Sequence, residues 1–249
     1  MTHNVVAIVQ ARMGSTRLPG KVMLPIANKP MLQHVIERLR ASLVLNNIAL
    51  TTTILKEDNY LEAFANLHGI VCYRGSVQDV LSQYYNAAIH LHATVIVRVN
   101  ADSPLIDPRL VDELVVSHLY TNADYTSNGN GGIQTFPLGV DSEVFSYNAL
   151  EKAYNESYKN YEREHVTTYI YQHPEIFKLK SVEAIGKLRR PDLRLTVDEE
   201  DDLRLVREIF DRLYCENQIF YTEDVIALLD GHPELISINA HVHQKKLGE

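Results

Sequence analysis

Short apolar runs alternate with amphipathic segments along the first hundred residues. The apolar runs are rich in β-branched residues, as in strands buried on both faces of a parallel sheet, and occupy 5–11, 48–54, 70–73 and 94–99. Between them, apolar residues recur at helical spacing after Pro30 and over 61–68 and 80–91. This alternation predicts an α/β fold with a mostly parallel sheet and helices on both faces.

The rhythm changes after a further predicted helix at 108–119. A run of Asn and Gly at 128–132 is a strong turn signal, and 136–145 alternates like a hairpin strand. The pattern then resumes with tyrosines at helical spacing over 154–161, a strand at 193–197 and an amphipathic helix from 203 to 213. We therefore expect a single domain over 1–249 with an inserted β-hairpin arm at approximately 123–182.

Composition narrows the function classes. The chain has 249 residues, of which 45% are hydrophobic, enough for one large core. Cys72 and Cys215 stand far apart, so neither a disulfide framework nor a cysteine zinc site is expected. The net charge of -8 argues against nucleic-acid binding. Without a signal-peptide pattern or an apolar run long enough for a membrane span, we expect a cytoplasmic protein that does not enter a membrane.

A cation-rich loop follows the first predicted strand. It reads QARMGSTRLPGK over 10–21, with three cations, two glycines and two hydroxyl side chains. Ligands of open α/β sheets bind beyond the carboxyl ends of strands, where glycine lets amides approach an anion and cations bind phosphate oxygens. The spacing is not that of a Walker loop, because five residues separate Gly14 from Gly20 and Val22 follows the lysine. A solvated surface loop is the alternative. The candidate nucleotide-binding residues of the loop are Ala11, Arg12, Gly14, Ser15, Arg17 and Lys21.

Two acids follow predicted strands that end at the same edge of the sheet. Asp102 comes after the strand at 94–99, and Asp198 after the strand at 193–197. Proteins usually bind Mg²⁺ through one or two carboxylate oxygens, and water and substrate phosphate supply the remaining ligands. Asp102 could instead form a turn, and Asp198 could belong to the acidic run at 199–202 that faces a helix dipole. Asp107 precedes a proline and a helix, so we assign it to N-capping.

Three ordered motifs resemble the cytidylyltransferases that make CMP-activated acidic sugars, typified by 3-deoxy-manno-octulosonate cytidylyltransferase. They are QARMGSTRLPGK at 10–21, RVNADSPLIDP at 98–108 and LTVDEEDDLRLV at 195–206. The spore coat polysaccharide biosynthesis branch is still more similar, through YRGSVQDVLSQYY at 73–85, FPLGVDSEVFS at 136–146 and YEREHVTTYIY at 161–171. The resemblance runs from the first strand to the helix after Asp198.

The resemblance implies a fold, a reaction and a site. The fold is a three-layer α/β/α sandwich of the nucleotide-diphospho-sugar transferase type, forming a homodimer through the arm. The reaction is Mg²⁺-dependent attack by the anomeric hydroxyl of a sugar acceptor on the α-phosphate of CTP, with release of pyrophosphate. By resemblance, Arg12 and Lys21, with Arg17, match triphosphate-binding cations, and Asp102 and Asp198 match the magnesium ligands. The residues that match cytosine contacts are Tyr73, Arg74, Gly75, Ser76 and Asn100.

The sugar itself stays open. The octulosonate enzymes carry Gln-Gly-Asp-Glu-Pro where this chain has Asn-Ala-Asp-Ser-Pro at 100–104, so neither base nor sugar preference can be transferred. Arg163 is a natural partner for a sugar carboxylate, although surface pairing with Glu162 and Glu164 is the alternative. The candidate sugar-binding residues in and after the arm are Asp141, Glu143, Arg163 and His165.

Two other functions compete with this interpretation. A glycosyltransferase that consumes a nucleotide sugar commonly shows Asp-x-Asp, whereas here Asn100 stands at the first position. A non-catalytic relative could keep the pocket without turnover, but the loop cations and both carboxylates are all retained. We therefore expect a cytidylyltransferase.

Overall fold

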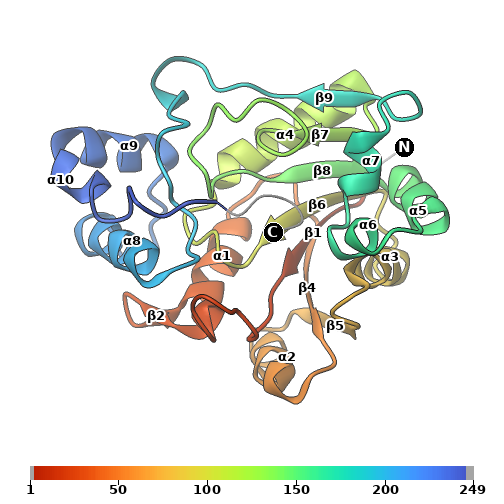
Figure 1. The fold of residues 1–249 in the computed structure, drawn as a ribbon, viewed down its shortest axis with the longest axis horizontal. Coiled ribbons are helices and arrows are strands. Elements are labelled where there is room, and N and C mark those ends of the chain that lie inside the picture. The colour runs from red at the N-terminus through yellow and green to blue at the C-terminus, as the bar shows by residue number, and fades with distance from the viewer. Residues whose placement is uncertain (1–2, 245–249) are drawn as a thin grey trace.

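The computed structural model describes residues 3–244 and is built around one twisted seven-stranded sheet (Figure 1). The strand order is β5-β4-β1-β6-β8-β7-β9. The first four of these strands are parallel, β8 runs antiparallel to both of its neighbours, and β9 is parallel to β7. The strands of this sheet are β1 (Val5–Gln10), β4 (Asn47–Thr53), β5 (Val71–Gly75), β6 (Val95–Asn100), β7 (Tyr125–Ser127), β8 (Glu143–Ser146) and β9 (Leu179–Ser181), and a separate pair is formed by β2 (Pro25–Ile26) and β3 (Lys29–Pro30).

Helices cover both faces of the sheet, which makes three layers. One face buries apolar side chains against α1, α2 and α4, and the other against α3, α5 and α7. A further apolar cluster joins α8 and α9 to the segment 193–197. The helices are α1 (Met31–Leu39), α2 (Asn59–Leu67), α3 (Val80–His90), α4 (Pro108–Thr121), α5 (Tyr147–Glu156), α6 (Asn160–Glu164), α7 (Thr168–Gln172), α8 (Glu200–Leu213), α9 (Thr222–Gly231) and α10 (Pro233–Ile236), with short 3₁₀ turns η1 (Lys21–Met23), η2 (Lys56–Asp58) and η3 (Gly186–Leu188).

The predicted α/β fold with helices on both faces is confirmed, and most element boundaries fall within one or two residues. Two predicted strands are wrong. The segment 193–197 makes only an isolated bridge between Leu138 and Arg194, and the predicted strand at 136–145 is a strand only from Glu143. Gly139 explains the second difference, because its φ of 100° bends the chain and a Cβ there would lie 2.3 Å from the amide nitrogen of Thr196.

The inserted segment extends the central sheet instead of standing apart from it. β7 and β8 pair antiparallel across the long loop 128–142, and β8 joins the edge of β6. Helices α5, α6 and α7 gather near α3 at the right of Figure 1, opposite α8, α9 and α10. The tyrosines predicted on one helix are divided, since α5 ends at Glu156 and α6 begins at Asn160. Within residues 3–244, no helix is both long enough and apolar enough to cross a membrane.

Candidate functional site

Lys21 joins three segments that are distant in the sequence. Its Nζ donates to Oδ2 of Asp102 at 2.7 Å, to Oδ1 of Asp198 at 2.9 Å and to the backbone carbonyl of Val197 at 2.8 Å. Asp102 follows β6, and Asp198 precedes α8. The two carboxylates and the lysine therefore meet at the carboxyl edge of the parallel strands, where sheets of this type bind their ligands.

The charges in this cluster stabilise one another. Burial alone would lower the pKa of Lys21, but the attraction of Asp102 and Asp198 and its hydrogen bonds to them outweigh burial and raise the pKa above 10.5. Burial would raise the pKa of Asp198, but the positive charges of Lys21 and Arg17 lower it below 3.8. At neutral pH the lysine is therefore charged and Asp198 is ionised.

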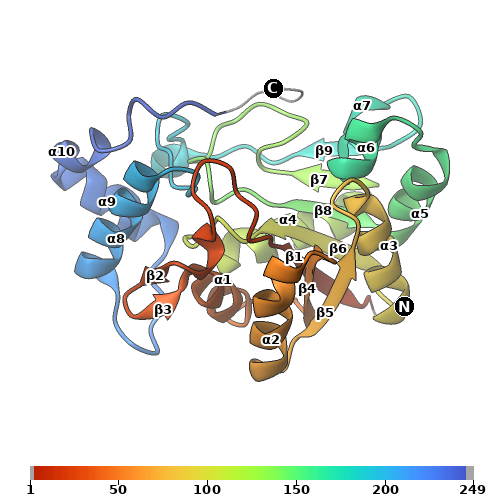
Figure 2. The same cartoon turned by 60° about the horizontal axis from the view of Figure 1, so that its bottom comes forward.

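The predicted phosphate loop is an ordered structure with free donors. The amides of Ser15 and Gly20 both donate to the carbonyl of Met13, at 2.9 Å each, and Gly20 adopts a φ of 69° that suits glycine. Figure 2 shows this loop, in red, rising beside α8. Inward-facing amides of such a loop can bind phosphate oxygens. Within the described part of the chain, no acceptor is found for the backbone amides of Arg12, Gly14, Thr16 and Arg17.

A buried acid fixes the base of the loop. Asp58 is fully buried, and its Oδ1 accepts from the amide of Met13 at 2.7 Å. Its Oδ2 accepts from the amide of Thr53 at 3.1 Å and from the Thr53 hydroxyl. Asp58 thus ties the loop after β1 to the end of β4.

Two arginines hold the far oxygen of Asp198. Oδ2 forms an ion pair with Arg17 at 2.9 Å and accepts a hydrogen bond from Nη2 of Arg194 at 2.8 Å. Arg17 also reaches Glu199, the N-cap of α8, at 3.2 Å. The predicted loop cation Arg17 is therefore attached to the carboxylate cluster from the loop side.

The arm brings further polar groups toward the cluster. Burial raises the pKa of Asp141, and the negative charges of Glu143 and Asp102 raise it further. The hydrogen bond from the amide of Gly139 acts in the opposite direction and lowers this pKa. Oδ1 of Asp141 accepts from the Gly139 amide at 2.8 Å, and Gly139 lies against the backbone of Thr196, two residues before Asp198.

The electrostatics of His165, in the arm, are linked to those of the phosphate loop. Burial lowers the pKa of His165, and the positive charges of Arg98 and Arg12 lower it further. Arg12 is exposed and makes no ion pair or hydrogen bond within residues 3–244. A loop cation without a partner and a neutral imidazole thus lie on the arm side of the site.

Glu143 and Arg163 are occupied by the protein itself. Glu143 is 3% exposed, accepts from Tyr125 and Thr167 at 2.6 Å each through Oε1, and pairs with the half-buried Arg98 through Oε2. Arg163 makes a bidentate pair with Asp79, at 2.9 and 2.7 Å, in place of the expected pairing with its helix neighbours. These contacts leave neither side chain free for a sugar, and we do not include them among the proposed sugar contacts.

The residues matched to cytosine contacts lie at the ends of β5 and β6, with side chains in different directions. Tyr73 packs edge-on against His90 with ring centroids 5.6 Å apart, and its hydroxyl is buried without a partner in the described chain. Arg74 binds Glu62 at 2.8 Å and two backbone carbonyls. The carbonyl of Gly75 accepts from the amide of Ile54, and that of Ser76 accepts from Gln83 at 2.9 Å. The half-buried side chain of Asn100 has no hydrogen-bond partner in the described chain.

The donor set fits a magnesium ion that is completed by substrate. Asp102 is 24% exposed, and its Oδ1 has no hydrogen-bond partner in the described chain. Residues 3–244 contain no group of three or more His, Cys, Asp or Glu side chains placed to hold a metal. Two carboxylates with water and phosphate oxygens are typical of Mg²⁺ and unlike a closed structural zinc site.

Sequence reasoning missed three residues that shape the site. Asp58 and Arg194 belong to no motif in the sequence, and Asp202 was placed in the acidic run at 199–202 that faces a helix dipole. Asp202 is instead fully buried, and its Oδ2 accepts from the amides of Asp198 and Glu199 at 2.9 and 3.1 Å. The capping pattern of an acid three residues after the N-cap was the available signal for Asp202. The N-capping role of Asp107 is confirmed.

Comparison with known sequences gives matches over nearly the whole chain. A family model described as "Cytidylyltransferase" matches residues 6–227. An uncharacterised protein of Methanocaldococcus jannaschii is 39% identical over 98% of both chains. The spore coat polysaccharide biosynthesis protein SpsF of Bacillus subtilis is 31% identical over 93% of this chain and 96% of its own. The 3-deoxy-manno-octulosonate cytidylyltransferase of Geobacter sulfurreducens is 34% identical over 45% of this chain and 44% of its own.

Solved structures have the same architecture. A cytidylyltransferase from Leptospira borgpetersenii superposes with a TM-score of 0.87 at 30% identity and covers 98% of this chain and 100% of its own. A CMP:2-keto-3-deoxy-manno-octonic acid synthetase in complex with CTP reaches a TM-score of 0.61 at 17% identity, covering 85% of this chain and 100% of its own. At that identity the second likeness establishes the fold alone.

Proposed function

The chain belongs to the cytidylyltransferase family, and from that premise we propose that it transfers CMP from CTP to the anomeric hydroxyl of an acidic sugar, releasing pyrophosphate. The observation that carries the proposal is the convergence of Lys21, Asp102 and Asp198 beside the loop of free amides. A nucleoside triphosphate would supply the anion that these donors lack, and the two acids would hold a metal ion that offsets its charge.

The loop and its cations bind and orient the triphosphate. The free amides of Arg12, Gly14, Thr16 and Arg17 are suited to phosphate oxygens, and the exposed Arg12 side chain adds a planar fork of donors. Lys21 is a fixed point charge, 10% exposed, between the two acids. Because Lys21 is held by three hydrogen bonds before substrate arrives, its charge stabilises the phosphates without reorganisation.

Asp102 and Asp198 are the residues that would hold Mg²⁺. The free Oδ1 of Asp102 and the ionised state of Asp198 support this role. When bound, the ion offsets phosphate charge and lowers the pKa of the attacking hydroxyl. Lys21, by its hydrogen bond to each acid, keeps both carboxylates turned toward the same point.

The acceptor is proposed to bind between the arm and the phosphate loop. Asp141 accepts from the amide of Gly139, which lies against the backbone of Thr196, and the Thr196 hydroxyl donates to the carbonyl of Asp102. His165, in the same arm, has a pKa that burial lowers and the charge of Arg12 helps to lower. The names of the relatives support a sugar, since one acts in spore coat polysaccharide biosynthesis and another is a 3-deoxy-manno-octulosonate cytidylyltransferase.

Homodimer formation through the arm is proposed as well. The proposal follows from the resemblance to the family, and the exposed arm residues Ile133 and Tyr158, at 66% and 86%, are the candidates for the interface. Light scattering should give a molar mass twice the 28.3 kDa of one chain. If a Tyr158→Glu variant remains a dimer of the same mass, the arm does not form the interface at this residue.

Pyrophosphate release is the direct test of the reaction. The protein is incubated with Mg²⁺, each of the four nucleoside triphosphates and a panel of acidic and neutral sugars. We expect pyrophosphate only with CTP and an acidic sugar, and its loss in Asp102→Ala. Asp112→Ala is the matched control, because Asp112 accepts from Ser42 and Leu43, away from the cluster. Nucleoside diphosphate released from a nucleotide sugar would favour a glycosyltransferase, and CTP binding without turnover a non-catalytic relative.

A further inference from the structure

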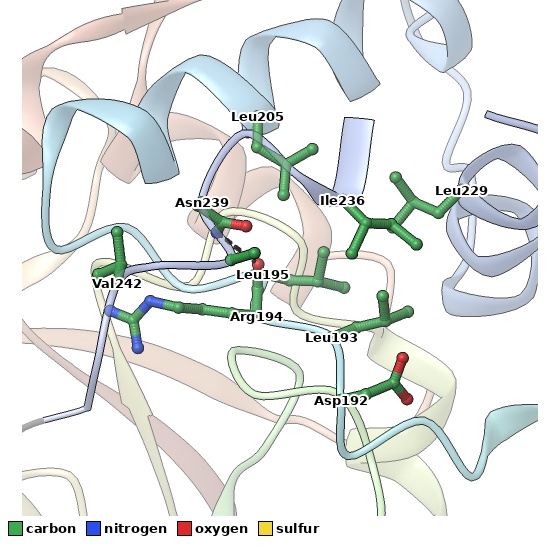
Figure 3. Close-up of a pocket in the computed structure, with 10 residues that line it drawn as sticks. Asp192, Leu193, Arg194, Leu195, Leu205, Leu229, Ile236, Asn239 and Val242 are labelled. Carbon is green, nitrogen blue, oxygen red and sulfur yellow. Dashed lines mark hydrogen bonds between the residues drawn. The ribbon is translucent and has the colours of Figure 1, made fainter. Parts of the chain in front are cut away.

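The C-terminal segment after α10 returns to the nucleotide side of the molecule. It passes over a cavity of about 150 Å³ whose apolar walls come from Leu195, Leu205 and Val242, among others. Figure 3 shows Asn239 on this returning segment, turned toward the backbone of Arg194. The segment lies beyond residue 227, where the match to the family model ends.

Two residues of this segment bind Arg194. Asn239 is 3% exposed, and its Nδ2 donates to the backbone carbonyl of Arg194 at 3.0 Å and to Oδ1 of Asp202 at 2.8 Å. The side-chain carbonyl of Gln244 accepts from Nη1 of Arg194 at 2.7 Å. The main chain and the guanidinium of Arg194 are thus both held by the returning segment.

Arg194 carries this contact on to the proposed metal ligand. Its Nη2 donates to Oδ2 of Asp198 at 2.8 Å, and its Nε donates to Oδ1 of Asp202 at 2.9 Å. Asp202 accepts in turn from the backbone amide of Asp198 at 2.9 Å. Asp198 is therefore fixed at its backbone by Asp202 and at its carboxylate by Arg194.

We propose that Arg194, held by Asp202, Asn239 and Gln244, is a positioning residue that sets the carboxylate of Asp198 for the metal and CTP. The C-terminal segment is by this account a part of the nucleotide site. Oδ2 accepts a hydrogen bond from Arg194 and is paired with the charge of Arg17, which favours the orientation in which Oδ1 accepts from Lys21 beside Asp102. Groups behind a metal ligand change metal affinity by about 10–100-fold when they are removed. The inference rests on the proposed function.

Manganese binding tests the proposal without turnover. Mn²⁺ is titrated into the full-length protein with CTP and no sugar, and free Mn²⁺ is read by electron paramagnetic resonance. Arg194→Met should weaken Mn²⁺ binding by about 10–100-fold. Arg194→Lys should recover part of the loss, because a lysine can reach one of the two acids. Asn239→Ala should weaken Mn²⁺ binding in the same direction and to a smaller extent.

A matched control separates positioning from folding. Arg190→Met removes an ion pair with Asp192 and Asp230 in the same part of the molecule, with no contact to Asp198. Equal Mn²⁺ affinity in Arg190→Met, Arg194→Met and Asn239→Ala would overturn the inference while leaving the function intact. Failure of the wild-type protein to bind Mn²⁺ with CTP would instead count against the proposed function. If Arg194→Met does not fold, the Asn239→Ala and Gln244→Ala variants decide, since both leave Arg194 in place.

Discussion

Replacing Asp58 with alanine tests how the phosphate loop is held. Asp58 is fully buried, has no cationic partner in the described chain, and accepts from the amides of Met13 and Thr53. The alanine leaves both amides without an acceptor in the interior. The loop then loses its tie to β4 at the residue whose carbonyl organises Ser15 and Gly20.

The magnitude is worked from the two orphaned backbone amides, because the third donor, the Thr53 hydroxyl, can rotate. Each buried donor left without a partner costs about 1–3 kcal/mol, so the free energy of unfolding should fall by about 2–6 kcal/mol. Water entering the space brings the expected loss toward about 3 kcal/mol, or roughly 6–12 °C in Tm for a protein of this size. Because the loop is no longer held, CTP must order it on binding. A loss of about 1.4 kcal/mol of binding free energy for this step raises the KM for CTP about tenfold.

The assay compares Asp58→Ala with Asp112→Ala. Asp112, in α4, also accepts from a backbone amide at 3.0 Å, but this amide belongs to Leu43 in the loop after α1. Both variants should have a lower Tm, and only Asp58→Ala should raise the KM for CTP, with the KM for the sugar little changed. An Asp58→Ala protein with the KM of the Asp112→Ala control would refute the reasoning.

Three further predictions concern charged groups. Lys21→Met should lower kcat/KM for CTP by about 10²–10³-fold, which is the usual effect of removing one fixed group that stabilises a developing charge. The measurement is steady-state kinetics at saturating Mg²⁺, and a change below threefold would contradict the prediction. Burial lowers the pKa of His118 from 6.5 to about 4, so the unfolded state binds its proton first as pH falls. The free energy of unfolding should then drop by about 2 kcal/mol from pH 7 to pH 5, and urea unfolding of His118→Gln should lose most of that slope. Glu143→Ala leaves the Arg98 charge without its carboxylate partner at a site only 11% exposed and should lower the free energy of unfolding in urea by about 3 kcal/mol. An unchanged midpoint with lost sugar binding would instead give Glu143 a substrate role.

The sheet was predictable because its signal is local. Each strand of the parallel half is a β-branched apolar run between helices, so the periodicity alone located β1, β4, β5 and β6 to within a residue or two. The segments at 136–145 and 193–197 failed because their extended shape comes from packing against each other, with Gly139 pressed onto Thr196. No ladder accompanies that contact, and alternation in sequence does not reveal it.

The site was only partly predictable, for a related reason. Lys21, Asp102 and Asp198 could be placed together because each follows a predicted strand or its loop. Arg194 and Asp58 could not, because their roles depend on tertiary burial that turns ordinary surface residue types into fixed partners. The same holds for Arg163, whose partner Asp79 is 84 residues away and not on its own helix.

The most direct test of the central claim is a crystal structure of the protein with CTP and Mn²⁺, read from the anomalous scattering of manganese. The account predicts one manganese peak bound by carboxylate oxygens of both Asp102 and Asp198, with the triphosphate seated on residues 12–21. A manganese ion that contacts only one of the two acids, or a triphosphate bound away from that loop, would contradict it.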